Sequence, residues 1–201
     1  VLVLVSPGDV VFAPNPTYPI HPYSAIIAGG DVRSIPIGPD RHFLEDLQHA
    51  TKQTWPRPKL LIISYPHNPT TEVVELEFFQ KIVDYAKENE LMVIHDLAYA
   101  DLTFDVPFGS PFDRPQLRHR SVALASISKS HALPGFRAGW AACPPELAPR
   151  LTLVTETILF GSQPFIGDAV VVALEQQHPE VKLLKRTFRE RAETMVAALH
   201  G

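Results

Sequence analysis

The stretch SISKSHALPGFRAG, residues 126–139, places two cationic side chains, Lys129 and Arg137, between apolar runs. The runs VALA before it and WAAC after it are typical of buried strands. A cation at the edge of a buried strand either extends into water or is held by an anion. Because Gly135 and Gly139 leave little side-chain cover, a buried guanidinium at Arg137 would need an anion beside it. The pair therefore indicates a site that binds an anionic ligand.

Further polar side chains follow several apolar runs at the point where each run ends. The runs lie at 10–14, 59–66, 91–96 and 121–126, and the polar residues at or after their ends are Asn15, Tyr18, His67, Asn68, Asp96, Tyr99, Ser126, Ser128 and Lys129. In open α/β sheets, ligands bind at the carboxyl ends of the strands, so we expect these side chains to converge on one rim. Each also has a structural explanation: Asn68 as a turn residue, Asp96 as a helix cap, Tyr99 as a core residue and Lys129 as a solvated lysine.

The elements that would position these residues alternate along the chain. The apolar spacing predicts helices over 18–28, 43–54 and 75–90 and a helical pattern from 146 to 201. Two further strands are expected at 32–37 and 138–143. Strands alternating with helices predict an α/β fold, with a mostly parallel sheet and helices on both faces in three α/β/α layers.

Composition excludes several classes of function. The 201 residues carry a formal net charge of −4, which gives no electrostatic footprint for nucleic acid or an anionic membrane. A single cysteine, Cys143, excludes an internal disulfide and favours a reducing, cytoplasmic compartment. No apolar run reaches the roughly 18 residues of a membrane helix, and the histidines show no metal-ligand spacing, so we expect no metal. The chain lacks an initiator methionine and stops within a helical pattern, which predicts a fragment of a longer protein.

Three motifs in this order resemble a known family. They are Asn68-Pro69, Asp96-x-x-Tyr99, and Ser126-x-Ser128-Lys129-x5-Gly135-x-Arg137-x-Gly139. Together they resemble the fold-type I pyridoxal-phosphate aminotransferases of the aspartate aminotransferase superfamily, class I/II. Three sequence segments, PNPTYPIHPY, PHNPTTEVVELEFF and HDLAYAD, are similar to those of bacterial alanine-forming and LL-diaminopimelate-type aminotransferases. The resemblance covers nearly the whole chain. It implies an amino-acid biosynthetic enzyme that uses pyridoxal 5'-phosphate to transfer an amino group between an amino acid, alanine or glutamate first, and a 2-oxo acid.

The resemblance also assigns roles to individual residues. Lys129 is expected to form the Schiff base with the cofactor aldehyde and then to move the proton at the substrate α-carbon. Asp96 is expected to pair with the pyridine nitrogen and keep it protonated. Tyr99 and Asn68 would donate hydrogen bonds to the ring's phenolic oxygen, and Tyr18 would stack on the ring.

The phosphate is expected to bind Arg137 and Ser126, with Ser128 as a lesser contact. The segment between Lys129 and Gly135 departs from the family. Relatives commonly carry an aromatic residue and then asparagine where this chain has His131 and Ala132, so no supporting role is carried over to that pair.

For the rest of the protein, the resemblance implies a large cofactor-binding domain over 1–180, with its N-terminal part missing. Residues 181–201 would begin the helix leading to an absent small domain. The loop that caps the phosphate and the arginine that binds the substrate carboxylate would lie outside this chain, and the full-length protein is expected to be a homodimer.

Two alternatives keep the fold: a fold-type I lyase such as a β-lyase, and a truncated, inactive fragment. A sensor domain fused to a DNA-binding region is disfavoured, because no helix-turn-helix or basic segment appears.

Overall fold

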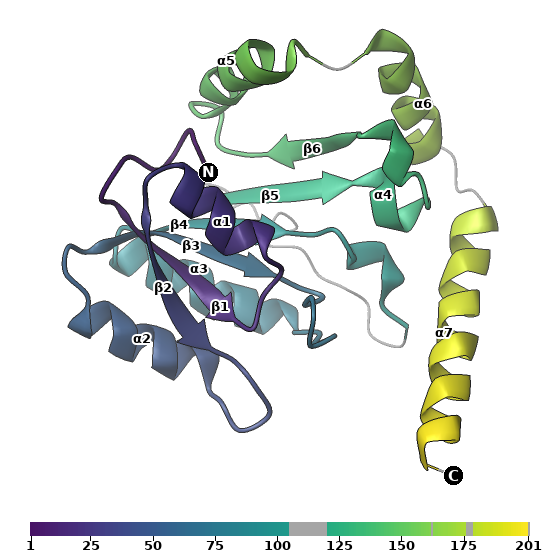
Figure 1. Cartoon of the computed structure of the whole chain (residues 1–201), viewed down its shortest axis with the longest axis horizontal. Coiled ribbons are helices and arrows are strands. Elements are labelled where there is room, and N and C mark those ends of the chain that lie inside the picture. Colours follow the sequence, from purple (N-terminus) through teal and green to yellow (C-terminus); the bar gives the residue numbers. More distant parts are fainter. Residues whose placement is uncertain (105–119, 162, 176–178, 201) are drawn as a thin grey trace.

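A six-stranded sheet forms the centre of the molecule (Figure 1). The computed structural model describes residues 1–104, 120–161, 163–175 and 179–200. The strands are β1 (Val10–Asn15), β2 (Asp31–Pro36), β3 (Pro58–Ser64), β4 (Met92–Asp96), β5 (Ser121–Ser126) and β6 (Gly139–Ala142). Their order across the sheet is β2-β1-β3-β4-β5-β6. The first five strands are parallel, and β6 runs antiparallel to β5.

The helices follow the strands along the chain, as the alternating pattern predicted. They are α1 (Ile20–Ile27), α2 (Phe43–Gln53), α3 (Leu76–Glu88), α4 (Ile127–Ser130), α5 (Ala148–Leu159), α6 (Pro164–Glu175) and α7 (Pro179–His200), with 3-10 turns η1 (Ala100–Leu102) and η4 (Pro134–Phe136). The stretch predicted as helical from 146 onward is three helices, and α5 ends where Phe160 and Gly161 both adopt positive φ. α7 begins two residues before position 181, where the change of domain was predicted, and that boundary stays a prediction.

Alternating residues of the central strands face opposite layers of the sheet. One layer packs Phe12, Leu61 and Ile63 against α2 and α3, and the other packs Leu60 and Ile62 against α1 and the N-terminal segment. A strand that is buried on both faces has a continuous run of apolar residues, and the run LLII at 60–63 of β3 has this pattern. The predicted mostly parallel α/β sheet with helices on both faces is confirmed.

The last three helices contrast with α1–α3, because they bury almost nothing within the described residues. α5 and α7 contain no buried residue, and α6 contains one, Ala173. In the described part of the chain no helix is both long and apolar enough to cross a membrane.

The pairing of β5 with β6 depends on a close backbone approach at Gly139, which lies opposite Ser126. A Cβ atom on Gly139 would lie 2.7 Å from the carbonyl oxygen of Ala125. Gly139→Ala should therefore separate the two strands and lower the free energy of unfolding by about 1–3 kcal/mol, measured by urea denaturation of the chain.

Gly135→Ala is the matched control. A Cβ there meets nothing within 4 Å, so this variant should unfold within about 0.5 kcal/mol of the wild type. Equal denaturation midpoints for the two variants would show that Gly139 is not needed for close approach.

Candidate active site

A cavity of about 100 Å³ lies at the carboxyl ends of the parallel strands. It is lined by Tyr18, Ser64, Asn68, Asp96, Ala98, Tyr99 and Lys129. These residues come from the segments at or after the ends of β1, β3, β4 and β5. The structure thus brings together five of the eight site residues predicted from the sequence, and Ser64, buried at the end of β3, adds a hydroxyl that the motifs did not indicate.

Asp96, the last residue of β4, is held by two hydrogen bonds. His21 donates from Nε2 to Oδ2 at 3.0 Å, and the backbone N–H of Ala98 donates to Oδ1 at 3.0 Å. Burial by itself would raise the pKa of Asp96, but the hydrogen bonds from His21 and Ala98 outweigh it, and the pKa is lowered. Burial lowers the pKa of the neighbouring His95 to about 3, so His95 is neutral and gives Asp96 no counter-charge at neutral pH. Asp96 is therefore ionised at neutral pH.

The His21 ring is itself oriented by a second partner. Thr17 Oγ1 lies 2.9 Å from His21 Nδ1, and the two residues are four positions apart at the start of α1. With Nε2 donating to the carboxylate, a neutral His21 accepts from the Thr17 hydroxyl, so the three side chains form one hydrogen-bonded series. The motifs in the sequence did not place His21 in this site. The Thr-x3-His spacing directly after β1 was the available signal.

Asn68 and Tyr99 contact one another across the cavity. Asn68 Nδ2 donates to Tyr99 Oη at 3.3 Å, which leaves the phenolic hydrogen of Tyr99 able to donate to a ligand. A second cavity, of about 370 Å³, is also lined by both residues, and several of its other walls are apolar, including Val73 and Leu102.

Lys129 lies on α4, a single helical turn directly after β5. The turn is capped by Ser126, whose Oγ accepts a hydrogen bond from the N–H of Ser128 at 3.0 Å. Ile127 is fully buried and fixes one side of the turn in the core, whereas Lys129 is exposed and lines the 100 Å³ cavity.

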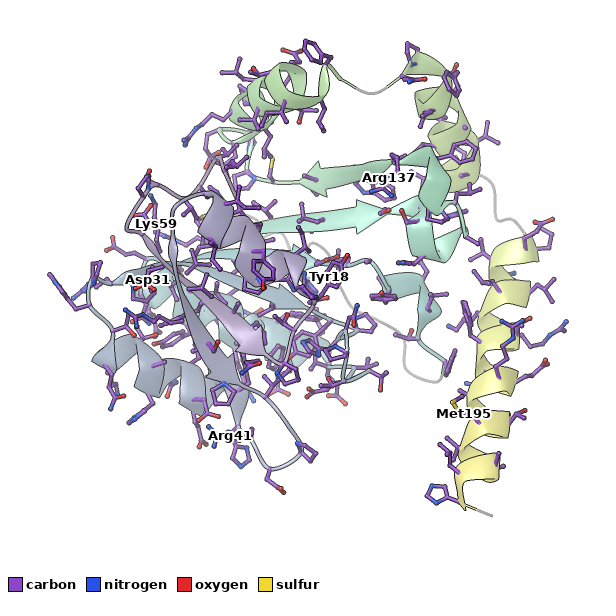
Figure 2. All side chains as sticks on the ribbon, in the orientation of Figure 1. Tyr18, Asp31, Arg41, Lys59, Arg137 and Met195 are labelled. Atoms are coloured by element: carbon purple, nitrogen blue, oxygen red, sulfur yellow. The ribbon has the colours of Figure 1, made fainter. Side chains whose placement is uncertain are left out.

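The residues predicted to hold a phosphate lie beside this turn. Ser126 Oγ is 2.8 Å from Ser128 Oγ and 3.0 Å from the carbonyl oxygen of Ala138. Arg137 follows η4 and precedes β6, and Figure 2 shows it next to α4. Of the two possibilities left open for this cation, the structure shows the one that extends into water: Arg137 is exposed, has a left-handed backbone with φ of 51°, and donates from Nη1 to the carbonyl oxygen of Pro134. The tight η4 turn directs this side chain outward, where it can meet a ligand.

The described residues contain no cluster of three or more His, Cys, Asp or Glu side chains that could hold a metal ion. Their chemistry is instead that of an amine, an ionised carboxylate, a phenol and an amide in one cavity, with two hydroxyls and a guanidinium beside it.

A family model described as aminotransferase class I and II matches residues 1–201.

The chain belongs to the class I and II aminotransferase family.

Curated and solved members of the family are similar over the whole chain. The glutamate-pyruvate aminotransferase AlaC of Escherichia coli (strain K12) is 36% identical over 202 residues, covering 99% of this chain and 48% of that protein. The LL-diaminopimelate aminotransferase of Aquifex aeolicus (strain VF5) is 34% identical over 199 residues, covering 98% and 51%. The solved structure of a probable N-succinyldiaminopimelate aminotransferase from Thermus thermophilus matches with a TM-score of 0.91 and 33% identity, covering 100% of this chain and 54% of that one. The chain therefore spans about half the length of the curated relatives it matches.

Aminotransferases of this family use pyridoxal phosphate, and the residues at the site fit that cofactor. An amine suits its aldehyde, an ionised carboxylate suits a protonated pyridine nitrogen, and hydrogen-bond donors suit its phenolic oxygen. Arg137 and the hydroxyls of Ser126 and Ser128 suit its phosphate. The part each residue takes stays a prediction.

The hydrogen bond from His21 should control the acidity of Asp96. His21→Phe keeps an aromatic ring beside Tyr18 but removes the donor, so burial should then dominate and the pKa of Asp96 should rise above that of the wild type. A carbon NMR titration of the labelled aspartate side chains measures this shift. In the wild type the pKa lies below its ordinary value of 3.8, so ionised Asp96 adds to stability at neutral pH, and this contribution is lost as the pH falls below about 4.

Asp9 serves as the internal control, because its lowered pKa depends on Lys59 and the N–H of Ser6 at the other end of the sheet. It should titrate identically in both proteins. An Asp96 resonance that also titrates identically would show that His21 does not hold the carboxylate.

Proposed function

We propose that the full-length protein carrying this chain is a pyridoxal-phosphate-dependent aminotransferase in which Lys129 is the covalent attachment point. The observation that carries the proposal is the meeting of Lys129 with an Asp96 carboxylate of lowered pKa, both lining one cavity at the strand ends. Pyridoxal phosphate, when bound, supplies a ring that accepts electrons from the substrate's α-carbon.

Asp96 would bind the protonated ring nitrogen through the lone pairs that His21 and Ala98 leave open. A carboxylate offers about four acceptor positions, and two are taken by these partners. Because both partners donate to the ionised form, Asp96 keeps its negative charge beside a positive ring nitrogen. Thr17 and His21 would thereby orient the carboxylate without touching the cofactor.

Lys129 would hold the cofactor through Nζ, with the aldehyde oxygen leaving as water, and in its free form the same amine would move the proton at the substrate's α-carbon. Lys129 lies on a capped turn and lines the cavity, so its amine would be available to a cofactor and a substrate there. Tyr99 would donate its phenolic hydrogen to the ring oxygen, since its own oxygen is already occupied by Asn68.

Arg137, Ser126 and Ser128 would hold the phosphate. The Ser126 hydroxyl hydrogen, now within reach of Ser128 Oγ and the Ala138 carbonyl, would turn to a phosphate oxygen. Arg137 would exchange its bond to the Pro134 carbonyl for the stronger one to a dianion.

For substrates, we propose the pairs alanine/pyruvate and glutamate/2-oxoglutarate. The similarity to AlaC, a glutamate-pyruvate aminotransferase, supports both pairs. The LL-diaminopimelate aminotransferases, which are of similar identity, make LL-diaminopimelate a further candidate amino donor. The lyase alternative gains no support, because the relatives are named aminotransferases.

We also propose that the full-length protein is a homodimer that covers the outer surface of α5 and α6. Large apolar side chains are exposed along this surface: Leu153, Ile158, Leu159, Phe160, Phe165, Val171 and Leu174. Between 151 and 173 the sequence carries only two charged residues, Glu156 and Asp168. An apolar surface with so little charge is typical of an interface, and a second copy of the chain presents the same surface.

The Lys129 assignment is tested by adding pyridoxal phosphate to the full-length protein. We expect a visible absorption band that borohydride reduction fixes on the peptide containing Lys129. Lys129→Ala should lose the band, and its alanine-to-2-oxoglutarate transamination should fall by about 10²- to 10⁴-fold, because the lysine's proton transfer is lost. Lys59→Ala, at the far end of the sheet in Figure 2, is the control and should retain both.

Arg137→Gln gives the second arm of that test. It should weaken binding of pyridoxal phosphate by about 10- to 100-fold, because charged hydrogen bonds to the phosphate are lost, and leave binding of phosphate-free pyridoxal unchanged. Arg137→Lys should recover part of the loss. A band that persists in Lys129→Ala, or an equal loss for both ligands in Arg137→Gln, contradicts the respective assignment.

The dimer is tested by sedimentation of the full-length protein. Phe160, 92% exposed with a φ of 56°, can become Asp without disturbing the core, and Phe160→Asp should shift the protein from dimer to monomer at micromolar concentration. Trp55→Asp, at an aromatic residue that is 82% exposed in the connection between α2 and β3, should remain dimeric. A wild-type protein that sediments as a monomer rules the interface out.

A further inference from the structure

His131 makes two polar contacts that join separate parts of the chain. Its Nδ1 lies 2.8 Å from the Oγ of Ser130, on the Lys129 turn. Its Nε2 lies 2.9 Å from the carbonyl oxygen of Ala173, on α6 and 42 residues further along the chain.

The Lys129 turn needs such external support because it is very short. α4 contains four residues, and an isolated turn of this length is unstable in water. Its first end is fixed by the Ser126 cap and by the buried Ile127. At its second end the N–H of His131 bonds to the Ile127 carbonyl at 3.2 Å, and Ala132 then leaves the turn with a left-handed φ of 54°. From this second end the His131 ring reaches α6.

The partners of the ring fix its tautomer. The Ala173 carbonyl can only accept, so Nε2 must carry a hydrogen and donate it. In the neutral ring Nδ1 then accepts from the Ser130 hydroxyl, which is closer to it than to its other neighbour, the Ser126 carbonyl at 3.3 Å. Ser130 is 3% exposed, so this hydroxyl has little access to water as a substitute partner.

α6 itself buries little. Ala173 is the one buried residue among the described part of α6, and His131 with Val172 borders a cavity of about 580 Å³ that α7 also lines. Loss of the His131 bond would therefore leave room for the second end of the turn to move.

We propose that His131 is a positioning residue that holds the Lys129 turn in place by bridging Ser130 and the Ala173 carbonyl. It does not touch the reacting atoms. The consequence for cofactor capture rests on the proposed role of Lys129, but the bridge itself does not.

The test compares His131→Phe, which keeps an aromatic ring without polar atoms, with His131→Gln, whose side-chain amide can still donate to Ala173. In the cofactor-free full-length protein, His131→Phe should exchange the backbone amide hydrogens of Ala132 and Leu133 about 3- to 10-fold faster than the wild type. Capture of pyridoxal phosphate by Lys129 should slow by a similar factor. In His131→Gln, the amide exchange rate and the rate of cofactor capture should each return at least halfway to the wild-type value, measured on a logarithmic scale.

His49→Phe, on the exposed side of α2, is the matched control and should change neither rate. Nitrogen NMR of the wild type tests the bridge without any substitution, and it should show His131 with Nε2 protonated and hydrogen-bonded. A neutral ring protonated at Nδ1, wild-type exchange in His131→Phe, or no recovery in His131→Gln overturns the proposal. If the wild type itself fails to capture pyridoxal phosphate, the role of Lys129 is wrong, and the exchange and NMR arms still decide whether the bridge exists.

Discussion

The negative charge of Asp96 at the end of β4 is the constraint on which the site depends. Taking a carboxylate out of water costs several kcal/mol unless hydrogen-bond donors replace the water. The Ala98 N–H supplies one donor locally, but the second, His21, comes from a helix that follows β1, two strands away in the sheet. α1 must therefore start close to the strand rim, and Thr17 fixes its first turn there through the His21 ring. The charge that would serve the cofactor thus also determines where the first helix lies.

The parallel sheet delivers the remaining groups to the same rim, and the return of the chain through β6 limits the lysine segment. After β5 the chain has room for one turn before it must reverse, because Gly139 already lies opposite Ser126 in the antiparallel pair. Because the connection is short, Lys129 is held by a helix cap and by single contacts. It is not held by a long helix or by a large buried surface. The short connection also explains why Arg137 stands in a left-handed conformation at the reversal, with its guanidinium directed away from the core.

The strands and five of the cavity residues could be predicted because their signals are local. An apolar run that ends in Asp96 or Ser126 indicates both the strand and the end at which ligands bind. The bond between His21 and Asp96 joins residues 75 positions apart, and no periodicity in either segment encodes it. The exposure of Arg137 stayed open for a related reason: its flanking glycines indicate a tight turn, but the direction of its side chain follows from the φ value adopted there.

Amphipathic pattern likewise predicts a helix without predicting what covers it. α3 buries four residues on the sheet, whereas α5, with a comparable share of apolar residues, buries none in the described chain. The surface of α5 and α6 is nevertheless connected to the site, since the Ala173 carbonyl of α6 accepts the hydrogen bond from His131 beside the lysine turn. Any contact that fixes α6 would also restrict the second end of that turn, because both are attached to one imidazole ring. Assembly at the outer surface and the position of Lys129 would then be coupled through a single side chain, over a path of two hydrogen bonds.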